Sequence, residues 1–368
     1  MFLKFMTARD KTVLITGGAG FIGTHTAEVL LANGYRVRVL DNLAPPTHDG
    51  SLPPWFQKDA EFFKGDVRSK EDWLVALKDV DAVVHLAAYM DSHPDYSTYF
   101  SVNALGTALL YEVIREHSLP IKKIILASSQ SVYGEGKYKC ALDSIQYPLQ
   151  RTKQQLELHQ WDVICPKCGK PMEVMPEQED DALYPLSAYG ESKVALERIA
   201  MNIGKQIGVP SVALRYSIVH GPYQSFRHYY SGALRSFVAM ALSGRDIEYH
   251  EDAQQLRDFV HAKDVADAHL CLLEDSRTDW QIYNVASGRT TSVFDLAKTV
   301  SDIVGVPFKT SKTVRFREAT PRNSIMDISK LKNLDWQPSH TLEDNVRDYV
   351  DWVRKYPEAH KYFSRASA

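Results

Sequence analysis

The stretch from Thr12 to Gly23, TVLITGGAGFIG, decides the fold of this chain. It begins with an apolar run of strand type, and three glycines follow at G-x-x-G-x-x-G spacing. The next segment, THTAEVLLANGY, has apolar residues at helical spacing and a stop at Asn33-Gly34. The N–H groups and the dipole of such a helix point at the glycine turn, where absent side chains let a pyrophosphate approach the backbone. The context predicts a dinucleotide site formed by Gly17, Gly20, Phe21, Ile22 and Gly23.

A second strand, YRVRVLDNL, ends in Asp41, 18 residues after Gly23. A carboxylate at this place can accept hydrogen bonds from both hydroxyls of an adenosine ribose and would repel a 2′-phosphate, so it favours NAD over NADP. Arg36 and Arg38 lie near enough to keep NADP open as an alternative. The ends of this strand and the next two supply further cofactor-binding candidates, namely Asn42, Asp66, Val67, Leu86, Ala87 and Ala88.

Strands and helices alternate from Thr12 to about Gly134, which predicts an α/β fold with a doubly wound parallel sheet of Rossmann type. A ligand then binds beyond the carboxyl ends of the strands. We expect a NAD-binding domain over 1–215 and a smaller mixed α/β substrate-binding lobe over 216–368, with part of 257–288 returning to the first domain. Residues 135–180 interrupt the alternation and are too many for an ordinary loop, so they form an insertion.

Composition narrows the class of protein. The chain has 368 residues, of which 44% are hydrophobic and 24% are charged, as in ordinary globular proteins. A net charge of −3 gives no basic surface for nucleic acid. The start, MFLKFMTARDK, lacks the apolar core of a signal peptide, and no run of 18 apolar residues predicts a membrane span. We therefore expect a cytoplasmic protein without nucleic-acid or membrane partners.

Tyr189 and Lys193 form a Y-x-x-x-K pair at the start of an expected helix. Four residues along a helix are a little over one turn, so both side chains project from one face with Cα atoms roughly 6 Å apart. An ammonium beside a phenol favours the phenolate, and so does a nearby nicotinamide cation. The pKa of the tyrosine, ordinarily about 10, can then fall towards neutrality, and Tyr189 can act as a base.

With these motifs the chain resembles the extended short-chain dehydrogenase/reductases, and within them the NAD-dependent nucleotide-sugar epimerase/dehydratase family. The likeness covers almost everything outside the insertion and rests on TGGAGFIG, HLAA, ASSQSVYG, YGESK, LRYSIVHGP, LRDFVHAKDVA and YNVASG. It implies that Ser129 hydrogen-bonds the reacting sugar hydroxyl, that Tyr189 is the base, and that Lys193 orients the cofactor ribose. Ser128 is the nearest alternative to Ser129, and Asn103 matches a helix asparagine at the cofactor.

The two residues after Ser129 separate the reaction types of this family. By the resemblance, dehydratases need an Asp-Glu pair there to eliminate water, and decarboxylating members usually keep a glutamate. Here the residues are Gln130 and Ser131, neither of which moves protons near pH 7. The remaining reactions need only hydride transfer: 4-epimerisation, or reduction of a 4-keto sugar.

Arginines near the C-terminus match the part of the family that binds the nucleotide diphosphate. Arg257, in RDFVH, and Arg322, in REATPRNS with Arg317 five residues before it, resemble family arginines at the diphosphate or ribose. The family's R-x-G-D-x-R loop is altered, because the Gly-Asp between the arginines is absent. A guanidinium suits this ligand because it can pair with two oxygens at once.

The insertion contains Cys140 and the knuckle CPKCG with Cys165 and Cys168. Such a glycine-containing turn is typical of structural zinc sites, for which Asp143 or His159 could supply a fourth ligand. A degenerate site without metal is the alternative, and Cys271 is expected in a helix core. Similar insertions occur in a subgroup of the family that resembles dTDP-L-rhamnose 4-epimerases.

The leading hypothesis is a nucleotide-sugar 4-epimerase that holds NAD tightly, recycles it, and acts on a nucleotide-diphosphate sugar such as a dTDP-6-deoxysugar. The alternatives are an NAD(P)H-dependent nucleotide-sugar 4-ketoreductase with the same residues, and a non-catalytic dinucleotide sensor or scaffold. The family often dimerises through the helices of Asn103 and Tyr189, so the resemblance also implies a homodimer.

Overall fold

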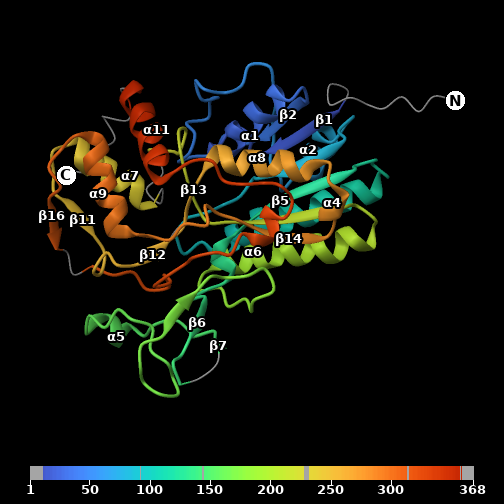
Figure 1. Ribbon diagram of the computed structural model, residues 1–368. Coiled ribbons are helices and arrows are strands. Elements are labelled where there is room, and N and C mark those ends of the chain that lie inside the picture. Colours follow the sequence, from blue (N-terminus) through green and yellow to red (C-terminus); the bar gives the residue numbers. More distant parts are fainter. Residues whose placement is uncertain are drawn as a thin grey trace.

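The computed structural model describes residues 11–91, 93–142, 145–227, 232–312, 315–356 and 358. Its central sheet has seven parallel strands in the order β14-β9-β5-β4-β1-β2-β3 (Figure 1). The strands are β1 (Thr12–Thr16), β2 (Arg36–Asp41), β3 (Glu61–Lys64), β4 (Ala82–His85), β5 (Lys123–Ser129), β9 (Ser211–Tyr216) and β14 (Gln281–Val285). The chain runs outward from β1 to β3 and then resumes at β4 on the other side of β1. The predicted doubly wound parallel sheet is confirmed, with its switch point between β1 and β4.

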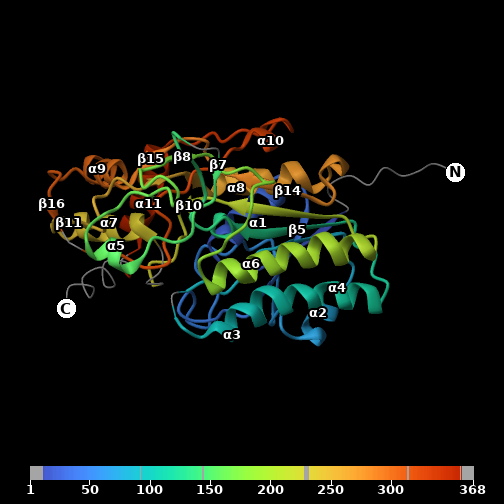
Figure 2. The same ribbon diagram turned by 90° about the horizontal axis from the view of Figure 1, so that it is seen from below.

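Helices cover both faces of this sheet, which explains why every residue of the inner strands β1, β4 and β5 is buried. Figure 2 shows α1 (Phe21–Ala32) and α8 (Ala262–Leu273) on one face, and α2 (Lys70–Ala76), α4 (Gly106–Glu116) and α6 (Ala188–Arg198) on the other. Alternate residues of β1 point to opposite faces. Val13 and Ile15 pack in one core with α1 and α8, whereas Leu14 packs in a second core with α2, α4 and α6.

Two of the predicted long helices contain a π-helical stretch. The helix of Asn103 runs through α3 (Tyr96–Tyr99), the π-helix η2 (Phe100–Leu105) and α4, and α6 continues as the π-helix η4 (Ile199–Gly204). Wider turns of this kind are often found at functional sites. Among the described residues, no helix combines the length and the apolar character that crossing a membrane requires.

The C-terminal lobe has its own apolar core, built by α7 (Gly232–Leu242), α9 (Val293–Val304) and α11 (Leu342–Lys355). Three short strand pairs complete it: β10 (Ile218–His220) with β13 (Phe259–His261), β11 (Ile247–Tyr249) with β16 (Thr310–Lys312), and β12 (Leu256–Arg257) with β15 (Thr291–Ser292). Three short helical elements lie elsewhere along the chain: η3 (Gln130–Val132) directly after β5, η5 (Ser276–Thr278) after α8, and α10 (Ser329–Lys332) before α11. The strand β14 follows α8 and joins the central sheet beside β9.

The insertion forms a small unit that extends away from the sheet (Figure 1). It contains β6 (Lys137–Lys139), β7 (Ile145–Gln146), α5 (Lys153–Glu157) and β8 (Glu173–Met175), with both β7 and β8 antiparallel to β6. Beyond β8 the chain meets the C-terminal lobe, where the N–H of Glu177 donates to the carbonyl of Ile325 at 2.9 Å. The insertion therefore has secondary structure of its own and is attached to the lobe.

Candidate active site

The glycine turn lies where the carboxyl ends of β1 and β4 meet the start of α1. Gly17 has φ +66°, and a Cβ on it would lie 2.9 Å from the backbone N of Ala87. A Cβ on Gly23 would lie 2.4 Å from the carbonyl O of Gly17. Gly20 is the N-cap residue of α1. These glycines bring the helix N-terminus directly against the strand ends, so the backbone around Leu86–Ala88 borders the turn.

The predicted ribose acceptor, Asp41, lies at the end of β2 beside this turn. Its Oδ2 accepts from the N–H of Ala19 at 3.1 Å and its Oδ1 from the N–H of Leu43 at 2.9 Å. Arg38, which kept NADP open, donates instead to Glu61 at 2.8 Å. This pairing weakens the case for Arg38 as a partner of a 2′-phosphate.

Asn42 and Asp66 come together beside Asp41, as their positions after neighbouring strands lead one to expect. The Asn42 side-chain amide donates to Asp66 Oδ2 at 3.1 Å. Hydrogen bonds from Arg68 lower the pKa of Asp66 to about 2, so this carboxyl is ionised near neutral pH. Val67 follows it and is buried in the core against α4.

Asn103 is buried, and its amide joins two elements of the site. Its Oδ1 accepts from the N–H of Tyr89 at 2.8 Å, and its Nδ2 donates to the carbonyl of Tyr89 at 3.0 Å and to Ser192 Oγ at 2.9 Å. Ser192 lies on α6 between Tyr189 and Lys193. Asn103 thus ties the loop after β4 to the helix that bears the predicted base.

Tyr189 and Lys193 lie on one face of α6, next to the end of β5. Lys193 Nζ is 5.6 Å from the centroid of the Tyr189 ring and donates to the carbonyl of Ala127 at 2.7 Å. A Cβ on Gly190 would lie 2.7 Å from the carbonyl O of Ser131, so glycine permits the close approach of α6 to the Ser129 strand end. Burial lowers the pKa of Lys193 to about 7, a shift that the nearby Glu197 carboxylate opposes.

Glu197 and Arg215 are site residues that the sequence analysis did not identify. Ser128 Oγ donates to Glu197 Oε1, and Arg215 makes two bonds of 2.8 Å to the two oxygens of Glu197. Ser129 Oγ instead lies 3.1 Å from Ser131 Oγ. Ser128 is thereby engaged in a buried charged pair. The signal was present, because Glu197 is four residues beyond Lys193 and therefore on the same helical face.

Gln130 connects the catalytic strand end to the C-terminal lobe. Its Oε1 accepts from Ser324 Oγ at 3.0 Å. Ser324 lies two residues after Arg322 and forms a β-bridge with Arg257. The end of β5 therefore contacts the same segment that carries the predicted nucleotide arginines.

The structure brings Arg257 and Arg322 together and leaves Arg317 exposed. Arg257 Nη1 donates to the carbonyl of Arg322 at 2.8 Å, and its Nη2 donates to that of Pro321 at 2.9 Å. Arg322 makes two bonds to Asp252, of 2.7 and 2.8 Å, and one of 3.0 Å to Glu251. Both guanidinium groups thus have protein partners that fix their orientation.

The three cysteines of the insertion form a cluster. Their Sγ atoms lie within 4.8 Å of one another, and those of Cys140 and Cys168 are 3.2 Å apart. The knuckle closes with a bond of 2.9 Å from the N–H of Gly169, at φ +69°, to the carbonyl of Cys165. His159 is not a member of the cluster and stacks on Trp161, so it is excluded as a fourth ligand in this arrangement. Asp143 lies outside the described residues.

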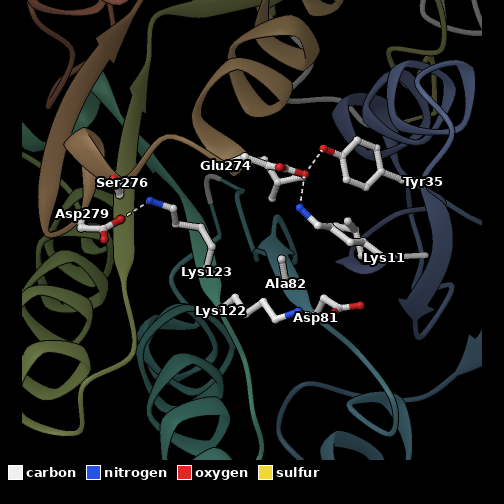
Figure 3. Close-up of a pocket in the computed structure, with 11 residues that line it drawn as sticks. Lys11, Tyr35, Asp81, Ala82, Lys122, Lys123, Glu274, Ser276 and Asp279 are labelled. Carbon is white, nitrogen blue, oxygen red and sulfur yellow. Dashed lines mark hydrogen bonds and ion pairs between the residues drawn. The ribbon is translucent and has the colours of Figure 1, made fainter. Parts of the chain in front are cut away.

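A separate cavity of about 220 Å³ lies at the other end of the strands, beside the amino ends of β1, β4 and β5 (Figure 3). Its lysines pair with its acids: Lys11 with Glu274 at 2.7 Å, Lys122 with Asp81 at 2.6 Å, and Lys123 with Asp279. Ligands of doubly wound sheets bind at the carboxyl ends, and the internal pairing leaves no net charge among these groups. We assign no ligand to this cavity.

Comparison with known proteins agrees with this geometry. The model of the NAD dependent epimerase/dehydratase family matches residues 13–155 and 165–286. The dTDP-L-rhamnose 4-epimerase of Burkholderia thailandensis is 34% identical over 351 residues, which cover 93% of this chain and 95% of that protein.

Two solved structures of UDP-glucose 4-epimerases share the fold. The enzyme of Thermotoga maritima with UDP-glucose is 28% identical, with a TM-score of 0.76, over 94% of this chain and 99% of that one. The enzyme of Thermus thermophilus in complex with NAD is also 28% identical, with a TM-score of 0.71, over 93% of this chain and 99% of that one. The resemblance seen in the sequence is confirmed: the chain belongs to the NAD-dependent epimerase/dehydratase family.

Proposed function

We propose that this chain is a nucleotide-sugar 4-epimerase that holds NAD tightly and recycles it. The observation that carries the proposal is the approach of α6 to the end of β5, because it sets Tyr189 and Lys193 beside Ser129 at the carboxyl edge of the sheet. Gln130 and Ser131 supply no second acid or base at this edge. The relatives named as 4-epimerases support the same conclusion.

The residues around the glycine turn fit NAD. A side chain at Gly17 would collide with the backbone of Ala87, and one at Gly23 with the carbonyl of Gly17, so only glycine lets the N-terminus of α1 pack this closely on the strand ends. A helix N-terminus in this place suits a pyrophosphate, and the Asp41 carboxylate stands beside it. We assign Gly17, Gly20, Phe21, Ile22, Gly23, Asp41, Asn42, Asp66, Val67 and Leu86–Ala88 to the cofactor, with Asn103 positioning α6. Bound NAD would supply the hydride acceptor and donor at sugar C4.

The protein's own groups then move one proton. The Tyr189 phenolate removes the proton of the sugar 4-hydroxyl, and Ser129 holds that hydroxyl by a hydrogen bond. Lys193 would stabilise the phenolate by its positive charge and would hold the ribose of bound NAD. After the 4-keto sugar has presented its other face, Tyr189 returns the proton to the oxygen, so the reaction involves no net oxidation.

We assign the nucleotide diphosphate to the region of Arg257 and Arg322, and propose a dTDP-6-deoxysugar such as dTDP-L-rhamnose as the substrate. The relative from Burkholderia supports this choice. The test is to incubate the purified protein with dTDP-L-rhamnose and with UDP-glucose, without added cofactor. We expect the C4 epimer of at least one sugar. Turnover of a 4-keto sugar only with added NAD(P)H would instead indicate a ketoreductase, and no turnover of any sugar would favour a sensor.

We further propose a structural zinc ion on Cys140, Cys165 and Cys168, with a fourth ligand outside the three. The cluster of three thiols around a CPxCG knuckle supports it. Elemental analysis of protein purified without added metal should find close to one zinc per chain. Zinc far below that value would identify a degenerate site.

The remaining proposals concern assembly. A homodimer through the helices of Asn103 and Tyr189 is supported by exposed apolar side chains at Tyr96, Phe100, Leu105 and Ile203. We also propose a boundary between two domains at 215/216, with β14 returning to the sheet of the first domain. The support for it is that the two parts have separate apolar cores. We place the protein in the cytoplasm, where free cysteines stay reduced.

A further inference from the structure

Arg151 belongs to the insertion, yet its guanidinium is buried against the C-terminal lobe. Its side chain is 2% exposed. Nη1 donates to Glu251 Oε2 and Nη2 donates to Glu251 Oε1, both at 3.0 Å. The same Oε2 accepts from Nη1 of Arg322 at 3.0 Å. Glu251 therefore joins the arginine of the insertion to the arginine assigned to the nucleotide.

Further contacts fix the orientation of Arg151 from both sides. Nη1 also donates to the carbonyl of Trp161 at 3.0 Å, within the insertion, and Nη2 to that of Thr320 at 3.2 Å, within the lobe. Nε lies 4.0 Å from Glu135 Oε2, and neither atom has a hydrogen-bond partner although both are buried. A guanidinium held in this way cannot turn away from Glu251 without losing several bonds.

Arg151 adds a third guanidinium to the polar seam between the insertion and the C-terminal lobe. The seam comprises Arg151, Arg257 and Arg322 with Glu135, Glu177, Glu251 and Asp252. Burial raises the pKa of Glu135 to about 7, and it raises that of Glu177 well above its ordinary value. Burial therefore disfavours the charged form of both carboxyl groups. Three guanidinium groups lie here beside two further carboxylates, those of Glu251 and Asp252, and this arrangement favours an anionic ligand such as a diphosphate.

We propose that Arg151 is a positioning residue for the nucleotide end of the substrate. Arg151 bonds both oxygens of Glu251, and Arg322 bonds one of them, so the two arginines share this carboxylate. The positive charge of Arg151 thereby offsets part of the negative charge beside Arg322, which leaves Arg322 more of its attraction for the diphosphate. The inference rests on the proposed function, because it needs a nucleoside diphosphate at Arg322. It gives the insertion a role in substrate affinity that the family's shared residues do not supply.

The test measures binding of dTDP and of UDP to purified protein by calorimetry, and the Michaelis constant for the sugar that wild type epimerises. In Arg151→Ala we expect the dissociation constant and the Michaelis constant to rise on the order of tenfold, with kcat changed less than about threefold. Lys153→Ala is the matched control. Lys153 also spans insertion and lobe, 3.8 Å from Glu318, but it is exposed, so both constants should stay at wild-type values.

A second substitution distinguishes positioning from general structural support. Glu251→Gln in the Arg151→Ala background removes the carboxylate that would then pair with Arg322 alone, so it should recover a substantial part of the lost affinity. Unchanged affinity in Arg151→Ala, or a double variant that binds no better than the single one, would overturn the proposal.

If Arg151→Ala fails to fold, the single variant Glu251→Gln decides the question. It should bind dTDP or UDP more tightly than wild type, and weaker or equal binding refutes the proposal. Wild-type turnover tests the proposed function separately.

Discussion

The central sheet and the insertion are ordered by different forces. The sheet buries apolar side chains on both faces, as β1 shows with Val13 and Ile15 in one core and Leu14 in the other. The insertion has short strands, three clustered thiols and a buried arginine that bonds to another part of the chain. The proposed chemistry therefore rests on a support that apolar packing makes rigid. The proposed contribution to substrate affinity comes from a small unit in which polar contacts and thiols add to a few buried apolar side chains, those of Tyr138, Leu156 and Val163.

This contrast predicts that damage to the sheet side of the site lowers turnover. Tyr189→Phe removes the only proposed base, so kcat should fall by a factor on the order of 10²–10⁴ while NAD remains bound. Steady-state kinetics and the absorbance of bound cofactor measure both. Tyr184→Phe is the control, because Tyr184 is an exposed tyrosine just before α6, and it should leave kcat unchanged. Near-normal turnover in Tyr189→Phe would refute the assigned base.

Damage to the insertion should act on substrate affinity instead. Cys165→Ser removes one thiol of the cluster, so the knuckle loses its order and Arg151 loses its support. We expect the Michaelis constant to rise about tenfold or more, with a smaller change in kcat and an unchanged unfolding transition of the sheet. Cys271→Ser, outside the cluster, serves as the control. A loss confined to kcat would show that the insertion contributes to chemistry.

Asp41→Ala tests the part of the sheet that is proposed to bind the cofactor. Removing this carboxylate deletes the ribose acceptor and the charge that repels a 2′-phosphate, so NAD should bind about tenfold more weakly and NADP relatively better. Competition between the two cofactors on protein stripped of NAD provides the measurement. Asp59→Ala, an exposed aspartate on the loop before β3, should bind both as wild type does. Wild-type protein that copurifies with NADP would contradict the role of Asp41.

A further prediction concerns the acid stability of the packed parts, away from the chemistry of the site. Burial lowers the pKa of His85, His220, His261 and His269 to about 3. These imidazoles stay neutral in the folded protein but take up protons in the unfolded chain below about pH 6.5. The free energy of unfolding therefore falls as the pH drops from about 6.5 towards 3. In His220→Leu, the loss between pH 7.5 and 5 should be smaller by about 2 kcal/mol, measured by urea unfolding. An unchanged pH dependence would show that His220 titrates normally.

The sequence was informative where structure is local. The strand, glycine turn and helix of 12–34 and the spacing of Tyr189 and Lys193 are read within a few turns of chain, so the fold and the proposed site were predictable. The face of β5 on which each serine lies was not decided, because neighbouring strand residues point to opposite sides. The Ser128 bond to Glu197, supported by Arg215, makes that distinction.

Contacts between distant segments could not be predicted in the same way. Arg151 and Glu251 are 100 positions apart, and no periodicity relates them. Arg322 was recognised as a nucleotide arginine, but its bonds to Glu251 and Asp252 depend on how the lobe and the insertion pack. Burial also sets the ionisation of Glu135, which a single sequence does not reveal.

The central claim is that one protein-held cofactor removes hydride from C4 and returns it to the same carbon. The most direct measurement uses a nucleotide sugar with deuterium at C4, incubated with purified protein and no added cofactor. The account predicts C4-epimeric product that keeps its deuterium at C4, at a rate that added NAD does not change. Product that has lost this deuterium to solvent, or that forms only with added NAD(P)H, would contradict it.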